Sequence, residues 1–326
     1  MKICIVGAGA IGGFIGARLA ASTGAPVAAL ARGATAAALR QHGWRLRLGD
    51  ALVGGPAIVA EAAAELGPQD VVVIAVKGQA LPDLAPSLTP LLGPATVVLP
   101  AMNGVPWWFS GGVPGLDAAP LQSVDLGGRI AQAIPAQHIV GCVVHASTFT
   151  PEPGLVQHKM GHGLIVGEPA GGDSARVQAL ASVLRTAGFE VTASPNVRYD
   201  IWYKLWGNLT MNPVSALTGA TIDRLLADPL VRAFCSDAMR EAALIGERIG
   251  CAIAQTPEDR HAVTERLGAF KTSMLQDVEA GRSLELDAIV GAVQELGARV
   301  GVPTPNVDAL LGLTRLMARV RGLYPA

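Results

Sequence analysis

The feature that most constrains the fold of this chain is a glycine pattern at its beginning, "KICIVGAGAIGGFIGARLAAS". The apolar run before the first of these glycines is typical of a buried parallel strand, and the run after them has helical spacing. A strand that turns tightly into a helix beside a phosphate needs glycines at this spacing, whereas a secretion signal does not. The pattern therefore predicts a dinucleotide-binding turn made by Gly7, Ala8, Gly9, Ala10, Ile11 and Gly12.

The rest of the first half alternates strand and helix patterns. Strands are predicted at "PVAALA", "DVVVIAV" and "ATVVLPAMNG", and helical patterns separate them, which is typical of a parallel sheet covered on both faces. Further strand patterns at "HIVGCVVHASTFT", "GLIVGE" and "FEVTAS", with a helix near 173–187, are assigned to the far side of the same domain. We expect an α/β fold whose first domain, 1–195, is a doubly wound sheet of the Rossmann type.

Strand patterns stop after Pro195, and the remainder is predicted to be helical. The expected helices cover 197–211, 229–249, 257–279, 284–300 and 307–321. The second domain, 196–326, is therefore predicted to be all-α.

Charge and composition exclude several classes of partner. The 25 basic and 26 acidic residues give a net charge of -1, which offers no electrostatic basis for binding nucleic acid or an anionic membrane. No uninterrupted apolar run approaches the roughly 20 residues that a bilayer span requires. The four cysteines are far apart and form no C-x-x-C motif. We therefore expect a cytoplasmic protein whose partner is a small molecule.

The end of the second strand indicates which dinucleotide is bound. An Asp or Glu about 20 residues after the glycines would bind the 2′-hydroxyl of NAD, but this place holds "AALARG". Arg32 stands where a 2′-phosphate would need a cation, so NADP(H) is favoured; a solvated arginine at a helix start is the alternative. Lys77 and Asn103 follow the next two predicted strands, at the edge where open α/β sheets bind ligands.

The segment "YDIWYKLWGNLTMNPVSAL" carries a polar stripe on an apolar helix. Lys204, Asn208 and Asn212 recur every four residues, so each is rotated only about 40° from the one before. Their neighbours are large and apolar, and an unsatisfied buried polar group costs about 1 to 3 kcal/mol. The stripe therefore faces either water or a polar cleft.

A second group of polar residues lies in "TSMLQDVEAGRSLELDAIVG". Ser273 and Asp277 share a helix face, and Glu285 follows a break at Gly281. A helix capped by Ser283 would place Glu285 in its first turn, where a carboxylate is stabilised without any function. His158 and His162 have metal-ligand spacing but lie in strand patterns with no third ligand, so no metal site is predicted.

These motifs resemble those of the ketopantoate reductases, 2-dehydropantoate 2-reductases, over nearly the whole chain. The resemblance rests on "GAGAIGG", "VKGQ", "MNGV", "KLWGNLTMNPVSAL" and "SMLQDVEAGRSLELDAIVG". It implies that NADPH reduces the ketone of a 2-oxo acid, on the way to pantothenate, in an active site between a Rossmann domain and a helical domain.

The resemblance also implies roles for individual residues. Lys204 is the general acid, Asn208 and Asn212 hold the substrate, Ser273 contacts its carboxylate, and Glu285 orients the reacting groups or the cofactor. Lys77, Asn103 and Ala146 match cofactor or active-site positions, with Asn103 also counted among the substrate-binding residues. One position departs from the family: Ile222 stands where a further substrate-binding asparagine is expected.

Other functions remain open at this point. The nearest alternatives are a reductase of another 2-oxo acid and a 3-hydroxy-acid dehydrogenase, which shares the two-domain plan and a K-x-x-x-N helix. A protein that senses NADP(H) without turnover is the alternative from another class. The apolar helical half makes a homodimer plausible.

Overall fold

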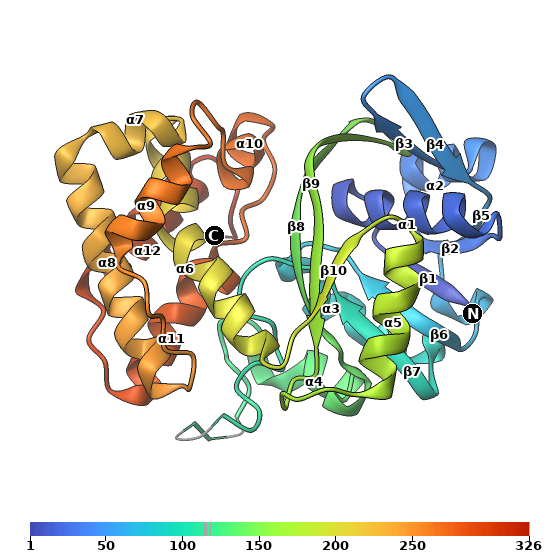
Figure 1. Cartoon of the computed structure of the whole chain (residues 1–326), viewed down its shortest axis with the longest axis horizontal. Coiled ribbons are helices and arrows are strands. Elements are labelled where there is room, and N and C mark those ends of the chain that lie inside the picture. Colours follow the sequence, from blue (N-terminus) through green and yellow to red (C-terminus); the bar gives the residue numbers. More distant parts are fainter. Residues whose placement is uncertain (114–115, 118, 326) are drawn as a thin grey trace. The chain divides into compact units, whose positions relative to one another are not determined.

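The computed structural model describes residues 1–113, 116–117 and 119–325. The chain forms two compact units, the first made of 1–102 with 129–200 and the second of 103–128 with 201–326 (Figure 1). The first unit contains the sheets and the second is largely helical, as the fold class predicted. The segment 103–128 thus groups with the helical unit, whereas the sequence prediction placed it in the first domain, 1–195.

The glycine motif belongs to a parallel sheet in the first unit. Its strand order is β5-β2-β1-β6-β7, and every pair is parallel. The strands are β1 Ile3–Val6, β2 Val27–Leu30, β5 Ala57–Ala60, β6 Gln69–Ile74 and β7 Leu92–Pro100. The helices of this unit are α1 Ala10–Thr23, α2 Gly33–His42, α3 Leu81–Leu84, α4 Arg129–Ala133 and α5 Ala175–Thr186. The predicted doubly wound sheet is confirmed.

A second sheet packs in the same unit. Its order is β10-β9-β3-β4, with β8 antiparallel to β9. The strands are β3 Trp44–Leu48, β4 Ala51–Gly55, β8 Gly141–Glu152, β9 Leu155–Gly167 and β10 Glu190–Ala193. The predicted helix after the second strand is present as α2, but the chain then forms the β3–β4 hairpin and β5, which were not predicted.

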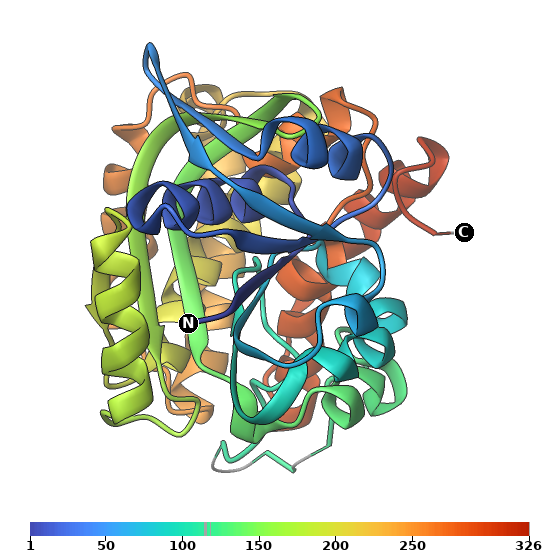
Figure 2. The ribbon, with the colours of Figure 1, turned by 90° about the vertical axis from the view of Figure 1, so that its right-hand side faces the viewer.

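Helix α1 contacts strands of both sheets (Figures 1 and 2). Small residues on α1 allow these close contacts. A Cβ at Gly16 would lie 2.7 Å from the ring of Trp44, and one at Gly13 would lie 2.5 Å from Val156. The core of the first unit therefore includes side chains from both sheets around this helix.

The second unit contains the following elements: α6 Val197–Thr218, which begins in the first unit, α7 Ile222–Ala227, α8 Pro229–Arg248, α9 Pro257–Glu265, α10 Ser273–Glu279, a π-helical turn Asp287–Gly291, α11 Ala292–Val300 and α12 Pro305–Val320. Three predicted helices were wrong in extent. The one over 197–211 continues to Thr218 as α6. The one over 257–279 is interrupted, with Gly268 at φ 62° between α9 and α10. The one expected to start at Leu284 begins with the π-helical turn. Helix α7 was not predicted.

Two charged side chains of α11, Glu295 and Arg299, hold the backbone at 120–123. Glu295 accepts hydrogen bonds from the backbone N–H groups of Gln122 and Ser123, both at 2.8 Å, and from the Ser123 hydroxyl at 2.6 Å. Arg299, one turn later, donates to Glu295 and to the Pro120 carbonyl, both at 2.6 Å. Burial alone would raise the pKa of the Glu295 carboxyl, but these hydrogen bonds bring it below its ordinary value.

The four cysteines are buried, and none of them is in a disulfide. Burial raises the pKa of the Cys4 thiol to about 12 and that of Cys235 to about 11. Among the helices of the described residues, none combines the length and apolar character needed to cross a bilayer.

Candidate active site

The glycine turn stands at the carboxyl end of β1. Gly7 has φ 89°, a conformation that side chains rarely adopt, and a Cβ there would lie 2.6 Å from Val76. A Cβ at Gly12 would lie 2.0 Å from the Gly7 carbonyl oxygen. The first turn of α1 can therefore approach the strand this closely only if residue 12 is glycine. These two glycines are therefore explained by the packing of the turn itself.

Gly9 is not explained by packing within the protein. A Cβ at Gly9 would have no heavy atom within 4 Å, and its φ of -79° is open to any residue. Gly9 is the N-cap of α1 and provides no side-chain hydrogen bond to the helix. The start of the helix is thus left without a side-chain cap, and first-turn N–H groups of this kind bind phosphate. This geometry fits the pyrophosphate of a dinucleotide.

Two predicted cofactor residues follow strands that neighbour β1. Val6 lies opposite Leu30 of β2 and Ile74 of β6, so that all three strands end at the same edge of the sheet. Arg32 follows β2, is exposed, and stands at the N-cap position of α2. Lys77 follows β6 and is half-buried. The sheet therefore brings both cations to the edge that carries the glycine turn.

Ala146 belongs to the other sheet. It lies on β8, between His145 and Ser147, where the register with β9 shifts. Its side chain is partly buried and packs against the core of the first unit.

The polar stripe of α6 occurs as predicted. Lys204 and Asn208 are half-buried, and Asn212 is only 5% exposed. Apolar neighbours such as Trp202 and Trp206, each 1% exposed, cover the other faces of the helix. The stripe is therefore partly covered by the protein, and the polar cleft stays a prediction.

Asn103 lies beside the predicted acid. The Lys204 Nζ donates a hydrogen bond to the Asn103 Oδ1 at 3.1 Å, and both residues belong to the second unit. The two residues are 101 positions apart in sequence. An amide oxygen accepts from an ammonium but adds no charge, so it can orient the Lys204 side chain while leaving its proton available.

Ser273 starts α10 next to the end of the stripe. Thr272, the N-cap of α10, has its hydroxyl 2.5 Å from that of Ser215 on α6, and both hydroxyls are buried. The Ser215 hydroxyl donates to the Asn212 carbonyl at 2.9 Å. This chain of contacts ties the start of α10 to the turn of α6 that carries Asn212.

Glu285 lies in the stretch between α10 and the π-helical turn, and its side chain is half-buried. Helical structure starts at Leu286, so Ser283 is not the N-cap residue and the capping explanation for Glu285 was wrong. Asp277, on α10, forms an ion pair with Arg282 at 2.8 Å.

The departure at Ile222 has a structural counterpart. Ile222 is 2% exposed and packs in an apolar cluster with Met211, Val214 and Leu225. Its side chain thus belongs to the core beneath the end of α6 and offers no polar group to a substrate.

The histidines of "QHKMGHG" have other partners. His158 stacks on Phe14 with ring centroids 5.3 Å apart, and the His162 Nε2 lies 3.0 Å from a Glu190 oxygen. The described residues contain no group of three or more potential metal ligands. The absence of a metal stays a prediction.

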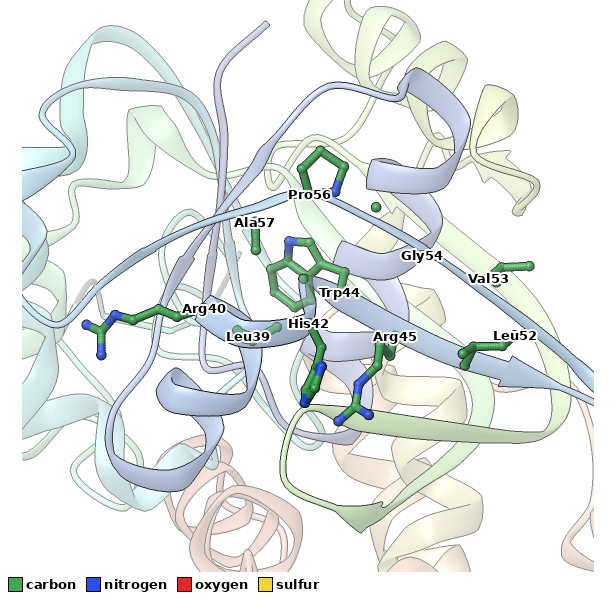
Figure 3. Close-up of a pocket in the computed structure, with 12 residues that line it drawn as sticks. Leu39, Arg40, His42, Trp44, Arg45, Leu52, Val53, Gly54, Pro56 and Ala57 are labelled. Carbon is green, nitrogen blue, oxygen red and sulfur yellow. The ribbon is translucent and has the colours of Figure 1, made fainter.

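A surface pocket of about 740 Å³ lies elsewhere in the first unit, between the end of α2 and the β3–β4 hairpin (Figure 3). Its two arginines already have partners, because Arg40 pairs with Glu61 at 2.9 Å and Arg45 pairs with Glu152 at 3.2 Å. None of the predicted site residues lines it.

Comparisons with known proteins agree with the motifs. The model described as "Ketopantoate reductase PanE/ApbA" matches residues 3–171, and its C-terminal counterpart matches 196–318. A 2-dehydropantoate 2-reductase of Mesorhizobium japonicum is 44% identical over 99% of this chain and 100% of its own length. A crystal structure from Ralstonia solanacearum MolK2, assigned to the ketopantoate reductases, is 55% identical with a TM-score of 0.95 and covers 99% of both chains.

Two more distant structures share the fold. A ternary structure of D-mandelate dehydrogenase with NADH and anilino(oxo)acetate has a TM-score of 0.84 at 22% identity, over 99% of this chain and all of its own. A dimeric ketopantoate reductase from Staphylococcus aureus has a TM-score of 0.75 at 20% identity, over 99% of this chain and all of its own.

The fold and the full-length relatives define an oxidoreductase that acts on a small molecule. The chain belongs to the ketopantoate reductase family.

Proposed function

We propose that this protein reduces 2-dehydropantoate (ketopantoate) to pantoate with NADPH. The observation that carries the proposal is the Lys204 ammonium in the polar stripe of α6, held 3.1 Å from the Asn103 amide oxygen. The 44% identity to a 2-dehydropantoate 2-reductase over its full length supports the same substrate.

The reduction adds one hydride and one proton to the C2 ketone. The nicotinamide supplies the hydride. Negative charge then develops on the carbonyl oxygen, where the Lys204 ammonium stabilises it and donates the proton that completes the hydroxyl. The lysine regains a proton from solvent, so the cycle leaves the protein unchanged.

The remaining polar residues are proposed to bind and orient the substrate. Asn208 and Asn212 continue the stripe beyond Lys204 and would bind the substrate's oxygen atoms. Ser273, tied to that part of α6 through Thr272, would contact the carboxylate. Glu285 would orient the reacting groups or the cofactor.

Most of the proposed cofactor contacts belong to the first unit. Gly7–Gly12 would hold the pyrophosphate, with Lys77 and Ala146 as further contacts of that unit, and Asn103 would add a contact from the second unit. Arg32 favours NADPH over NADH, because a guanidinium can bind a 2′-phosphate in bidentate fashion. NADH is the cofactor in the D-mandelate dehydrogenase structure, so the family fold accepts a nicotinamide cofactor.

A second candidate is a reductase with broader 2-oxo acid specificity. The observation that favours it is the buried, apolar Ile222 where a substrate-binding asparagine was expected. A site with one polar contact fewer would discriminate less between ketopantoate and analogues without its hydroxyl.

We also propose a cytoplasmic location, which the buried cysteines without disulfides support. We propose a homodimer as well, as expected from the sequence.

The test is an NADPH absorbance assay with ketopantoate, 2-oxoisovalerate and pyruvate. We expect kcat/KM for ketopantoate to exceed that for 2-oxoisovalerate by at least about tenfold, because buried groups left unpaired by the smaller acid cost free energy. Equal values would support the broader reductase.

In the same assay, Arg32→Ala should raise the KM for NADPH about tenfold or more and change the KM for NADH little. Equal weakening of both cofactors would exclude the 2′-phosphate role.

A further inference from the structure

Glu285 lies between two residues that the end of the chain holds in place. Before it, the Leu284 backbone N–H donates to the Leu323 carbonyl at 3.0 Å. After it, the Tyr324 hydroxyl donates to the Asp287 Oδ1 at 2.5 Å. Consecutive residues of the C-terminal tail thus hold the backbone before Glu285 and the Asp287 side chain after it.

The tail itself is well anchored. Leu323 is 5% exposed, and its backbone N–H donates to the Ala318 carbonyl at 2.7 Å, which closes the end of α12. The Arg319 side chain donates to the Pro325 carbonyl at 3.1 Å. Tyr324 is therefore presented from a fixed backbone and not from a frayed end.

The π-helical turn Asp287–Gly291, which begins with Asp287, also contacts the loop that carries Asn103. The Ala288 carbonyl accepts a hydrogen bond from the Val105 N–H at 2.8 Å. Gly104 has φ 81°, and a Cβ there would lie 2.4 Å from the Ala288 oxygen. One turn of backbone therefore connects the position of Glu285 with that of Asn103, the partner of Lys204.

The Tyr324–Asp287 contact joins a neutral donor to a carboxylate. Burial raises the pKa of the Asp287 carboxyl, and the Tyr324 hydrogen bond, together with Arg315 and Arg319, opposes that rise. Burial and the neighbouring carboxylate raise the pKa of Tyr324 to about 12, so the phenol remains a hydrogen-bond donor at neutral pH.

We propose that Tyr324 is a positioning residue that, through Asp287, sets the place of Glu285 in the active site. This inference rests on the proposed function, because Glu285 matters only if the site reduces a 2-oxo acid. Nothing in the sequence pointed to Tyr324, since it lies 39 residues beyond Glu285 and follows the last helix.

The main test is Tyr324→Phe, which removes the hydroxyl and keeps the ring. We expect kcat for ketopantoate to fall about tenfold, the scale of loss from misplacing a reacting group by part of an ångström. The NADPH dissociation constant should stay unchanged, since the glycine turn is untouched. Hydrogen–deuterium exchange should rise in the peptide 284–291. Thr304→Val, which removes a 3.0 Å hydroxyl–carboxylate bond at the other end of α12, is the matched control.

Two further comparisons separate positioning from general destabilisation. Asp287→Asn keeps an oxygen acceptor for Tyr324 and should retain most of the activity that Asp287→Ala loses. In a Glu285→Ala background, Tyr324→Phe should cause no additional loss of kcat, because the residue through which it acts is gone.

The outcomes distinguish this inference from the proposed function. Wild-type protein without turnover of any 2-oxo acid would overturn the proposed function, while faster exchange of 284–291 in Tyr324→Phe would still support the tail contact. Normal kcat in Tyr324→Phe, or a similar loss in Thr304→Val, would overturn the positioning role. Unchanged exchange of 284–291 would overturn it as well.

Discussion

The glycine turn of the first unit and the polar stripe of the second are both parts of the proposed site, but they are built differently. In the turn, Gly7 and Gly12 are required by backbone packing, and the open position at Gly9 leaves the helix start accessible. In the stripe, Lys204 depends on Asn103, which comes from a segment far away in sequence. One part is made of local backbone and the other of side chains brought together by tertiary structure.

This difference teaches which parts of a site tolerate change. A turn that binds its ligand through backbone N–H groups loses that binding when a side chain occupies the space of the ligand, even if the protein still folds. A side-chain site is lost when one functional group is removed, even if its shape is kept. The following predictions test whether the two parts separate in this way.

The largest expected effect is that of Lys204→Ala. It should lower kcat by about 10² to 10⁴, the contribution of a positioned general acid, and leave NADPH affinity nearly intact. Steady-state kinetics and a fluorescence titration of NADPH measure the two quantities. Lys271→Ala, which removes an exposed lysine paired with Glu279, is the control and should be almost neutral. Near-normal turnover by a folded Lys204→Ala protein would remove this residue from the mechanism.

An intermediate effect is expected for Gly9→Ala. The new methyl group meets no protein atom within 4 Å, so the melting temperature should change little, whereas NADPH binding should weaken about tenfold or more. Gly12→Ala, with a Cβ 2.0 Å from the Gly7 oxygen, should lose both stability and binding.

Gly312→Ala is the matched control, because a Cβ there also meets nothing within 4 Å and the position is on α12. NADPH binding should not change, and the melting temperature should rise slightly, because alanine is more favourable than glycine inside a helix. If Gly9→Ala binds NADPH as tightly as the wild type does, the turn does not hold the pyrophosphate.

The smallest expected effect is on stability and concerns the anchor of 103–128. Glu295→Gln should lower the free energy of unfolding by about 1 to 2 kcal/mol at pH 7, because charged hydrogen bonds to Ser123 and Arg299 are weakened. The folded pKa of Glu295 lies below its ordinary value of 4.5, so its contribution is present above that pH. It is lost as pH falls through the folded pKa.

The difference between Glu295→Gln and the wild type should therefore narrow below about pH 4.5, as followed by urea denaturation across pH. Glu258→Gln, an identical change in an exposed pair with Arg240, should cost much less at every pH. A constant difference down to pH 3 would show that the carboxylate charge is not what stabilises this anchor.

Sequence reasoning predicted the parts that depend on local spacing. The glycine turn follows from three residues within six positions, and the stripe of Lys204, Asn208 and Asn212 follows from helical periodicity. The fold class followed from the same alternation of periods. The relation of Arg32 and Lys77 to neighbouring strands could also be predicted, since parallel strands end at a common edge.

Other parts could not be predicted, because they depend on long-range packing. No local pattern places Asn103 beside Lys204, or Tyr324 against Asp287. The hairpin β3–β4 was missed because it needs glycines that approach a neighbouring backbone, as Gly54 approaches the Trp44 carbonyl oxygen. A cap at Ser283, the alternative explanation for Glu285, is wrong because helical structure starts at Leu286 with the π-helical turn.

The grouping of 103–128 with the helical unit has a consequence for how this protein could be divided or recombined. The chain passes from one unit to the other at 102, at 128 and again at 200. A single cut near residue 200 would leave Glu295 and Arg299 in one fragment and the backbone that they hold in the other. An exchange of substrate-binding modules between relatives therefore needs two sequence blocks transferred together, 103–128 and 201–326, because the proposed acid and its amide partner are encoded in different blocks.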